Sequence, residues 1–190
     1  MLNATAHIDT FARDNLPSVD TWPELLLDGF NYPSCLNVAA ELTDAMVLKG
    51  FGDHTALIGN GRRRTYKELT DWTNRIAHVL VDDMGVQPGN RVLIRSANNP
   101  AMVACWLAAT KVGAVVVNTM PMLRAGELSK YVDKAQITFA LCDTRLMDEM
   151  DVCADQNSIL KYVMGFDGTS NHDAELDRLA LEKPVQFEVV

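Results

Sequence analysis

The sequence predicts an α/β fold: a mainly parallel sheet flanked by helices, with a β-hairpin on its N-terminal side. Four apolar runs suited to strands follow one another at intervals of 22 or 23 residues, with helical segments between them. Each run is apolar throughout rather than alternating, which indicates strands buried on both faces. Strand–helix–strand alternation then implies parallel strands and right-handed crossovers. The runs are Val92–Ile94, Val115–Val117, Ile137–Leu141 and Leu160–Val163.

Residues 1–35 are expected to form a lead-in, and residues 36–190 a partial α/β domain. In the lead-in, Thr21 and Glu24 have the spacing of a capping box. This pattern predicts one or two helical turns over Trp22–Leu27.

A longer helix is predicted over Leu36–Lys49, with Asn37 as its cap and Gly50 as its stop. Three of its apolar residues fall on one predicted face: Leu42, Ala45 and Met46.

A hairpin follows, because Ala56–Ile58 and Arg64–Tyr66 flank Asn60-Gly61, a pair that supplies the positive φ angles of a tight primed turn. The three arginines at 62–64 are interpreted as a solvated edge that discourages strand pairing.

Thr65 and Glu68 form a second capping box, which opens the most regular amphipathic helix of the chain; Gly85 ends it. Residues 87–90 then read as a turn. The predicted buried face comprises Leu69, Trp72, Ile76, Val79 and Leu80, and the predicted wet face comprises Lys67, Asp71, Asn74 and Arg75.

Helices are predicted between the buried strands. After the last of these strands, a weaker helix and one more strand are predicted. The helices are Pro100–Lys111, Ala125–Lys134, Asp143–Ala154 (capped by Asp143) and Ala174–Leu181, and the final strand is Val185–Val190.

The composition of the chain argues against some classes of binding partner. The chain has 190 residues, a net charge of −8 and 48% hydrophobic residues. This acidic balance argues against nucleic acid and against an anionic membrane surface as partners. The N-terminal residues show no secretory signal, and the longest apolar stretch, 101–117, is too short and interrupted to span a bilayer. The expected location is the cytoplasm.

The search for catalytic motifs finds no phosphate loop, no nucleophile elbow and no metal-ligand spacing. The four cysteines form no C-x-x-C pair and are interpreted as reduced structural thiols, so no metal is expected. His78, in the middle of a predicted helix, is interpreted as a hydrogen-bonded structural imidazole.

Open α/β sheets bind ligands beyond the carboxyl ends of their strands. A ligand site is therefore expected in the loops at these ends, but the position of the loops does not indicate a reaction. The substrate-adjacent candidates in them are Asn98, Asn99, Asn118 and Thr119.

Several ordered stretches carry a family resemblance: R-T-Y-K-E-L (64–69), N-R-I-A-H-V-L (74–80), G-V-Q-P-G-N-R-V (85–92), W-L-A-A-T-K-V-G-A-V-V-V-N-T (106–119) and R-A-G-E-L (124–128). Together they resemble the N-terminal part of the adenylate-forming acyl-CoA synthetases. The stretches N-V-A-A-E-L (37–42), R-S-A-N-N-P (95–100) and M-P-M-L-R-A-G-E-L (120–128) are most similar to the benzoate and 2-aminobenzoate–CoA ligase branch.

The resemblance implies a parent enzyme that uses ATP, Mg²⁺ and coenzyme A to convert a small carboxylic acid, of the aromatic kind in this branch, into its thioester through an acyl-adenylate. It also implies that Arg145 lies near the position at which some relatives bind the nucleotide phosphate of coenzyme A. The Ser/Thr/Gly-rich phosphate loop, the ribose-binding Asp and the catalytic Lys of the family are absent, so no catalytic residue is carried over.

The chain is therefore expected to be an N-terminal fragment that is inactive alone, holds no cofactor tightly and self-associates through surface that the rest of the enzyme would cover. The parent gene is expected to continue into a T-S-G-T-T-G-like segment. Two alternatives stay open: a complete small ligand-binding module without catalysis, and an interaction protein that keeps the scaffold without the activity.

Overall fold

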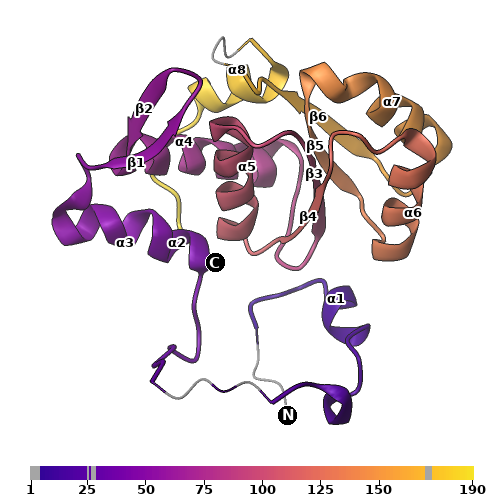
Figure 1. Ribbon diagram of the computed structural model, residues 1–190, viewed down its shortest axis with the longest axis horizontal. Helices are drawn as coiled ribbons and strands as arrows, with labels where there is room; N and C mark the ends of the chain where they lie inside the picture. Colours follow the sequence, from indigo (N-terminus) through magenta and orange to yellow (C-terminus); the bar gives the residue numbers. More distant parts are fainter. Residues whose placement is uncertain (1–4, 25, 27–28, 170–172) are drawn as a thin grey trace.

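The computed structural model describes residues 5–24, 26, 29–169 and 173–190 (Figure 1). A four-stranded parallel sheet in the order β4-β3-β5-β6 forms its centre, which confirms the predicted fold class. β3 lies between β4 and β5, with Arg95 opposite Thr119 on one side and Cys142 on the other. The strands are β3 (Arg91–Arg95), β4 (Val115–Thr119), β5 (Phe139–Asp143) and β6 (Tyr162–Phe166).

Helices cover both faces of the sheet (Figure 1). One face carries α4 (Tyr66–His78, continued by η3, Val79–Asp83), α5 (Pro100–Lys111) and α8 (Glu175–Glu182). The other carries α6 (Ala125–Ala135) and α7 (Met147–Gln156, preceded by η4, Thr144–Leu146).

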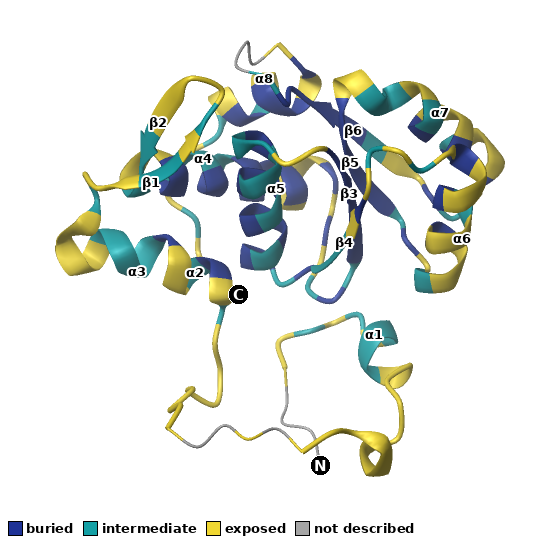
Figure 2. Ribbon diagram, viewed as in Figure 1, coloured by how far each residue is buried: buried dark blue, intermediate teal, exposed yellow. Residues whose placement is uncertain are grey.

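The alternating side chains of each strand enter two hydrophobic clusters. Ile94 and Leu141 belong to the cluster under α4, α5 and α8, whereas Leu93 and Ala140 belong to the one under α6 and α7. All four side chains are buried, and β3 and β5 are dark blue along their length in Figure 2. This double burial explains why the runs are apolar at every position.

The hairpin and the helix after it form as predicted. β1 (Thr55–Gly59) and β2 (Arg62–Thr65) are antiparallel, and Asn60 and Gly61 both have positive φ angles, 51° and 70°. The Thr65 hydroxyl accepts from the backbone N–H of Glu68, whose carboxylate accepts from the N–H of Thr65. These local bonds close within a few residues, so the sequence alone could reveal them.

The helix predicted over Leu36–Lys49 is broken. α2 (Val38–Leu42) and α3 (Asp44–Met46) are separated at Thr43, which has φ −124° and ψ −78°, and η2 (Val47–Phe51) follows. Asn37 caps α2 as predicted, and Gly50 has a φ of 88°. The break rotates the buried face: Ala39 and Thr43 are buried while Leu42 is exposed.

The helix predicted over Trp22–Leu27 is wrong in its described part; Leu25 and Leu27 lie outside the described residues. Trp22 is extended, with φ −76° and ψ 143°, because the proline after it disfavours helical angles. The lead-in instead contains α1 (Phe11–Asp14) and η1 (Val19–Thr21).

The lead-in is attached to the amino-terminal end of the sheet. Asp9 forms an ion pair with the buried guanidinium of Arg91 and accepts a hydrogen bond from Asn90. The backbone N–H groups of Ile8 and Asp9 both donate to the carbonyl of Pro88 at 3.0 Å. The sheet is thus contacted by residues more than eighty positions earlier in the chain.

The strand predicted over Val185–Val190 is absent, because side chains of other elements bind its carbonyl groups. Asn74 donates to Val185 at 2.8 Å, and a ring nitrogen of His78 lies 2.7 Å from the carbonyl oxygen of Gln186. The prediction that Asn74 faces solvent is also wrong, since its amide is buried and accepts from Lys111 at 2.7 Å. His78 is the structural imidazole that the sequence predicted.

Cys105, Cys142 and Cys153 are buried and carry free thiols, and the free thiol of Cys35 lies on an exposed residue. Burial raises the pKa of the Cys142 thiol to about 12, which keeps it protonated. Among the described residues, no helix is long and apolar enough to cross a membrane.

Candidate functional site

The direction of the crossovers reverses between β3 and β5. β3 continues into α5 on one face of the sheet, whereas β5 continues into α7 on the other face (Figure 1). In open α/β sheets, the loops after two such neighbouring strands separate and leave a crevice in which ligands bind. The topology therefore singles out the carboxyl ends of β3 and β5 as the candidate site.

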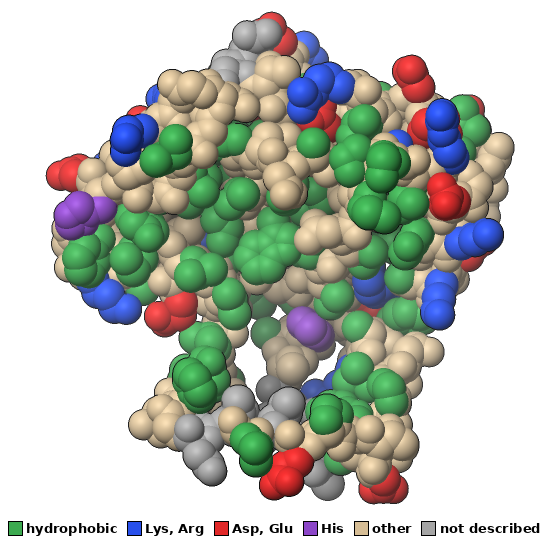
Figure 3. All heavy atoms as spheres, viewed as in Figure 1, with side chains coloured by type: hydrophobic (Ala, Val, Ile, Leu, Met, Phe, Trp, Pro, Cys, Tyr) green, Lys and Arg blue, Asp and Glu red, His purple; other side chains and the backbone are tan. Residues whose placement is uncertain are grey.

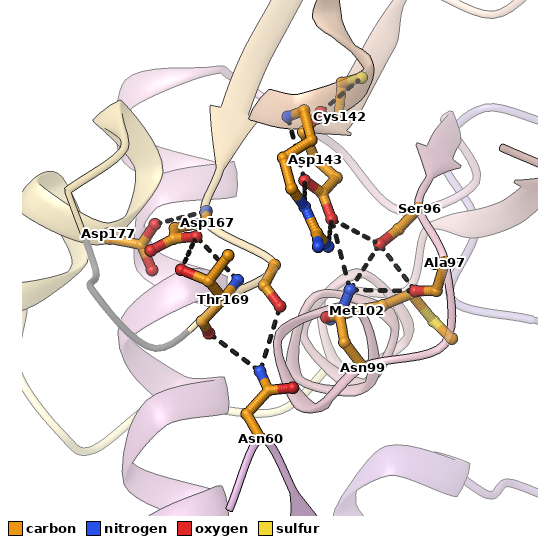
Figure 4. Close-up of polar contacts among 12 residues, drawn as sticks. Asn60, Ser96, Ala97, Asn99, Met102, Cys142, Asp143, Asp167, Thr169 and Asp177 are labelled. Atoms are coloured by element: carbon orange, nitrogen blue, oxygen red, sulfur yellow. Dashed lines mark hydrogen bonds and ion pairs between the residues drawn. The ribbon is translucent and has the colours of Figure 1, made fainter.

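A buried carboxylate lies at this position. The side chain of Asp143, the last residue of β5, is 1% exposed. Its Oδ2 atom is 3.4 Å from both the Ser96 hydroxyl and the Asn99 amide, which follow β3 (Figure 4). Asn99 also donates to Ser96 at 2.9 Å and caps α5 by accepting from the N–H of Met102. The sequence could not predict this grouping, because it depends on β5 lying next to β3.

Arg145 binds the same carboxylate. Its Nη2 donates to Oδ2 of Asp143 at 2.6 Å, its Nε to Oδ1 at 2.9 Å, and its backbone N–H to Oδ1 at 3.1 Å. Burial opposes ionisation of Asp143, but the bonds from Arg145 outweigh it and hold the pKa below its ordinary value. The positive charge of Arg145 is thus largely neutralised by the carboxylate of Asp143, although the Arg145 side chain is 54% exposed.

The loop after β6 closes over this ion pair. A Cβ atom at Gly168 would overlap Oδ2 of Asp143, so the backbone there lies directly against the carboxylate. The side chain of Asn60, at the tip of the hairpin, donates to the carbonyl groups of Gly168 and Thr169, each at 3.1 Å (Figure 4). Thr169 in turn donates to Asp167. The hairpin tip, this loop and β5 therefore form one polar cluster.

Beside the cluster, the carboxyl ends of β3 and β4 leave an open hollow of about 500 Å³. It contains three of the predicted candidates, Asn98, Asn118 and Thr119, while Asn99 and Arg145 lie in the cluster around Asp143. Thr119 donates to the carbonyl of Ile94 at 3.4 Å. The full lining is Ile94, Ser96, Ala97, Asn98, Met102, Asn118, Thr119, Met120 and Pro121. This lining consists of amide, hydroxyl and apolar side chains and contains no charged one.

Sequence reasoning missed one residue that organises both regions. Arg95 is 2% exposed, and its guanidinium donates to the carbonyls of Pro121 (2.9 Å) and Leu146 (3.3 Å), in the loops after β4 and β5. Its Nη1 atom is buried without a hydrogen bond to the described residues. An arginine at the end of an otherwise apolar strand was the available signal.

The described residues contain no group of three or more His, Cys, Asp or Glu side chains that could hold a metal ion. The geometry thus provides a positioned ion pair and an open polar hollow, which do not by themselves indicate a reaction.

A family model for "AMP-binding enzyme" matches residues 45–186. The chain belongs to this family. AMP-binding relatives include 3-oxocholest-4-en-26-oate–CoA ligase of Rhodococcus rhodochrous, 30% identical over 68% of this chain, and 3-hydroxybenzoate–CoA ligase of Aromatoleum, 37% identical over 43% of it. The chain spans 23% and 16% of the length of these two relatives.

Solved structures of the AMP-binding family share the fold. The crystal structure of the anthranilate CoA ligase AuaEII, in complex with anthranoyl-AMP, superimposes with a TM-score of 0.71 over 80% of this chain and 28% of that one, at 16% identity. The four-stranded sheet and its helices therefore share the fold of part of that larger chain.

Proposed function

We propose that the chain is the N-terminal part of an ATP-dependent acyl- or aryl-CoA ligase. The match of residues 45–186 to the AMP-binding family carries this proposal, and both curated relatives described above are CoA ligases by name. In the proposed reaction, a carboxylate attacks ATP to give an acyl-adenylate and pyrophosphate. The thiol of coenzyme A then displaces AMP and forms the thioester.

We propose a small aromatic carboxylate as the acid. The higher identity to the 3-hydroxybenzoate ligase and the fold shared with the anthranilate ligase support this choice. The candidates Asn98, Asn118 and Thr119 are proposed to border the substrate from the open hollow.

The residues of this chain do not fit ATP phosphates or Mg²⁺. The sequence has no phosphate loop, and Asp143, the buried carboxylate of the cluster, is neutralised by Arg145. We therefore derive no step through these groups and propose that other parts of the parent enzyme bind them.

Arg145 remains a proposed contact for a phosphate of coenzyme A, because its Nη1 makes no hydrogen bond to the described residues. In the parent enzyme, Arg145→Ala is then expected to raise the KM for coenzyme A while leaving the KM for the acid unchanged.

The chain is proposed to consist of a lead-in segment, residues 1–35, and one partial α/β domain, residues 36–190. The described contacts that attach the lead-in around Asp9 and Arg91 involve the end of the sheet and not its interior, which supports this division.

Pyrophosphate release tests the function. The purified 190-residue chain, with ATP, Mg²⁺, coenzyme A and benzoate or hydroxybenzoates, is expected to release pyrophosphate at the background rate. The product of the whole reading frame that contains these codons is expected to form AMP and an aryl-CoA thioester. Acid-dependent turnover by the short chain, or none by the long product with any aromatic or aliphatic acid, would contradict the proposal.

A further inference from the structure

The side-chain amide of Asn60 connects two parts of the candidate site. Its Nδ2 atom donates to the carbonyls of Gly168 and Thr169, each at 3.1 Å (Figure 4). These bonds join the hairpin tip to the loop of residues 167–169, whose backbone lies against the carboxylate of Asp143. The partners are more than a hundred positions apart in the sequence. The nitrogen atom of this amide therefore holds the loop in place.

Asn60 is followed by Gly61, and the dipeptide Asn-Gly occurs once in the sequence. Asparagine side chains are chemically labile in water, and a following glycine favours the reaction because it has no Cβ atom to obstruct the attack. The backbone nitrogen of Gly61 attacks Cγ of Asn60 and forms a C–N bond. The side-chain nitrogen takes up the proton that Gly61 loses and leaves as ammonia. Water then opens the resulting succinimide ring to aspartate or isoaspartate, and both products carry a carboxylate and lack the N–H donor.

The hairpin tip is accessible to this reaction. Asn60 and Gly61 are both exposed, and a Cβ atom at Gly61 would meet no atom of a non-neighbouring residue within 4 Å. Within the described part of the chain, the N–H of Gly61 has no backbone hydrogen-bond partner. Figure 3 shows the tip at the surface, on the upper margin of the molecule. Asn157, which precedes Ser158, differs because it is buried and its amide donates to the Ser129 hydroxyl at 2.8 Å.

The two hydrogen bonds from Asn60 restrain the reaction while the loop is in place. They hold Nδ2 against the loop, so the side chain cannot turn its Cγ atom towards the nitrogen of Gly61. Deamidation is therefore expected from the state in which the loop has separated from the hairpin tip. Once the amide is lost, a carboxylate would face two carbonyl oxygens with no proton between them, which is costly in free energy. The separated state is then favoured.

We propose that Asn60 is a modification site, at which spontaneous deamidation releases the loop of residues 167–169 from the hairpin. The amide holds the loop before the reaction, and the carboxylate that replaces it repels the same two carbonyls. Because ammonia is lost to the solvent, the change is one-way. The closure over the ion pair of Asp143 and Arg145 is thus lost as the chain ages. This inference does not rest on the proposed function.

Peptide mass spectrometry of the 190-residue chain, incubated for weeks at physiological temperature and pH, tests the reaction. Asn60 is expected to deamidate several-fold faster than Asn157. Gly168→Ala, whose methyl group displaces the loop, is expected to accelerate deamidation at Asn60 several-fold. Gly126→Ala, at a position with open space, is the matched control and is expected to leave the rate unchanged. Circular dichroism verifies that both variants fold.

Hydrogen exchange provides a second test that does not depend on a glycine substitution. The N–H of Thr169 donates to Asp167 at 2.7 Å, so its exchange rate reports on the order of the loop. Asn60→Asp reproduces one product of the reaction. It is expected to accelerate the exchange of Thr169 by about tenfold or more, because two hydrogen bonds to the loop are lost. Asn31→Asp makes the same change at an exposed position of the lead-in and is expected to leave that rate unchanged.

Three outcomes would overturn the proposal: deamidation of Asn60 no faster than that of Asn157, equal rates at Asn60 in the folded Gly168→Ala and Gly126→Ala variants, or equal exchange of Thr169 in Asn60→Asp and Asn31→Asp.

Discussion

The polar contacts at the carboxyl edge of the sheet centre on the carboxylate of Asp143. It receives three hydrogen bonds from Arg145 and two longer ones, of 3.4 Å, from Ser96 and Asn99. Removing the guanidinium would leave a buried carboxylate with one backbone hydrogen bond and the two long contacts, which is costly in free energy.

Arg145→Ala is therefore expected to lower the free energy of unfolding by about 1–3 kcal/mol at pH 7, as measured by urea denaturation. Arg63→Ala, at an exposed position of β2, is the control and is expected to change stability by about 0.5 kcal/mol or less. Equal effects of the two variants would contradict the role given to the ion pair.

The pH dependence of this effect has a defined sign. The pKa of Asp143 is lower in the folded chain than its ordinary value of 3.8, because the bonds from Arg145 stabilise the ionised form. The contribution is thus fully present above pH 3.8 and disappears as the pH falls through the folded pKa. The stability difference between wild type and Arg145→Ala is expected to be constant from pH 7 to 5 and to shrink below about pH 4.

Single residues could be located from the sequence where their role is local. The cap formed by Asn37, the turn at Asn60 and the cap formed by Thr65 involve only residues a few positions away. The distant contacts of the Asn37 and Asn60 amides were not predicted. Asn98, Asn118 and Thr119 were placed at strand ends and lie around one hollow, and their role stays a prediction. Asn74 was misplaced, because its partners Lys111 and Val185 are distant in sequence.

At the scale of elements, residues 167–169, which follow β6, close the candidate site. Gly168 lies so near Asp143 that no side chain fits there without displacing the carboxylate. Asn60 holds the same loop from the hairpin tip. The closure thus joins β5, the loop and the hairpin.

Gly168→Ala is expected to destabilise the chain by about 1–3 kcal/mol, because the added methyl group forces the loop and the carboxylate apart. Gly126→Ala is the matched control: Gly126 lies in α6 with open space at its Cβ position. That substitution is expected to stabilise by up to about 1 kcal/mol. Thermal unfolding of both variants measures the difference, and a neutral Gly168→Ala would argue against tight closure.

Elements stabilised by their own pattern were predictable, and those decided by neighbours were not. α5 begins and ends at the predicted residues, and the ends of the four buried strands lie within three residues of the ends of their apolar runs. Residues 185–190 read as a strand, but side chains from α4 bind their carbonyls instead. The order of strands in the sheet, and hence the contact of Ser96 with Asp143, is not encoded by spacing.

For the whole molecule, the lead-in contributes stability without forming part of the sheet. A chain that begins at residue 36 is expected to fold, but with a free energy of unfolding about 1–3 kcal/mol lower, since Arg91 loses its carboxylate partner. Asp9→Ala in the full chain is expected to reproduce most of this loss in urea denaturation. Failure of the shortened chain to fold would show that the lead-in belongs to the domain.

The side-chain amide of Asn37 can complete its hydrogen bonds only late in the synthesis of the chain. It donates to the carbonyls of Thr110, Lys111 and Val190, the last of them 153 residues further along the chain. A ribosome adds about 5–20 residues per second, so Val190 is synthesised roughly 8–30 s after Asn37, and the hydrogen bond between them cannot form earlier. α2 can therefore pack on α5 once Lys111 has emerged, but the hydrogen bond from Asn37 to Val190 forms only after that residue has left the exit tunnel.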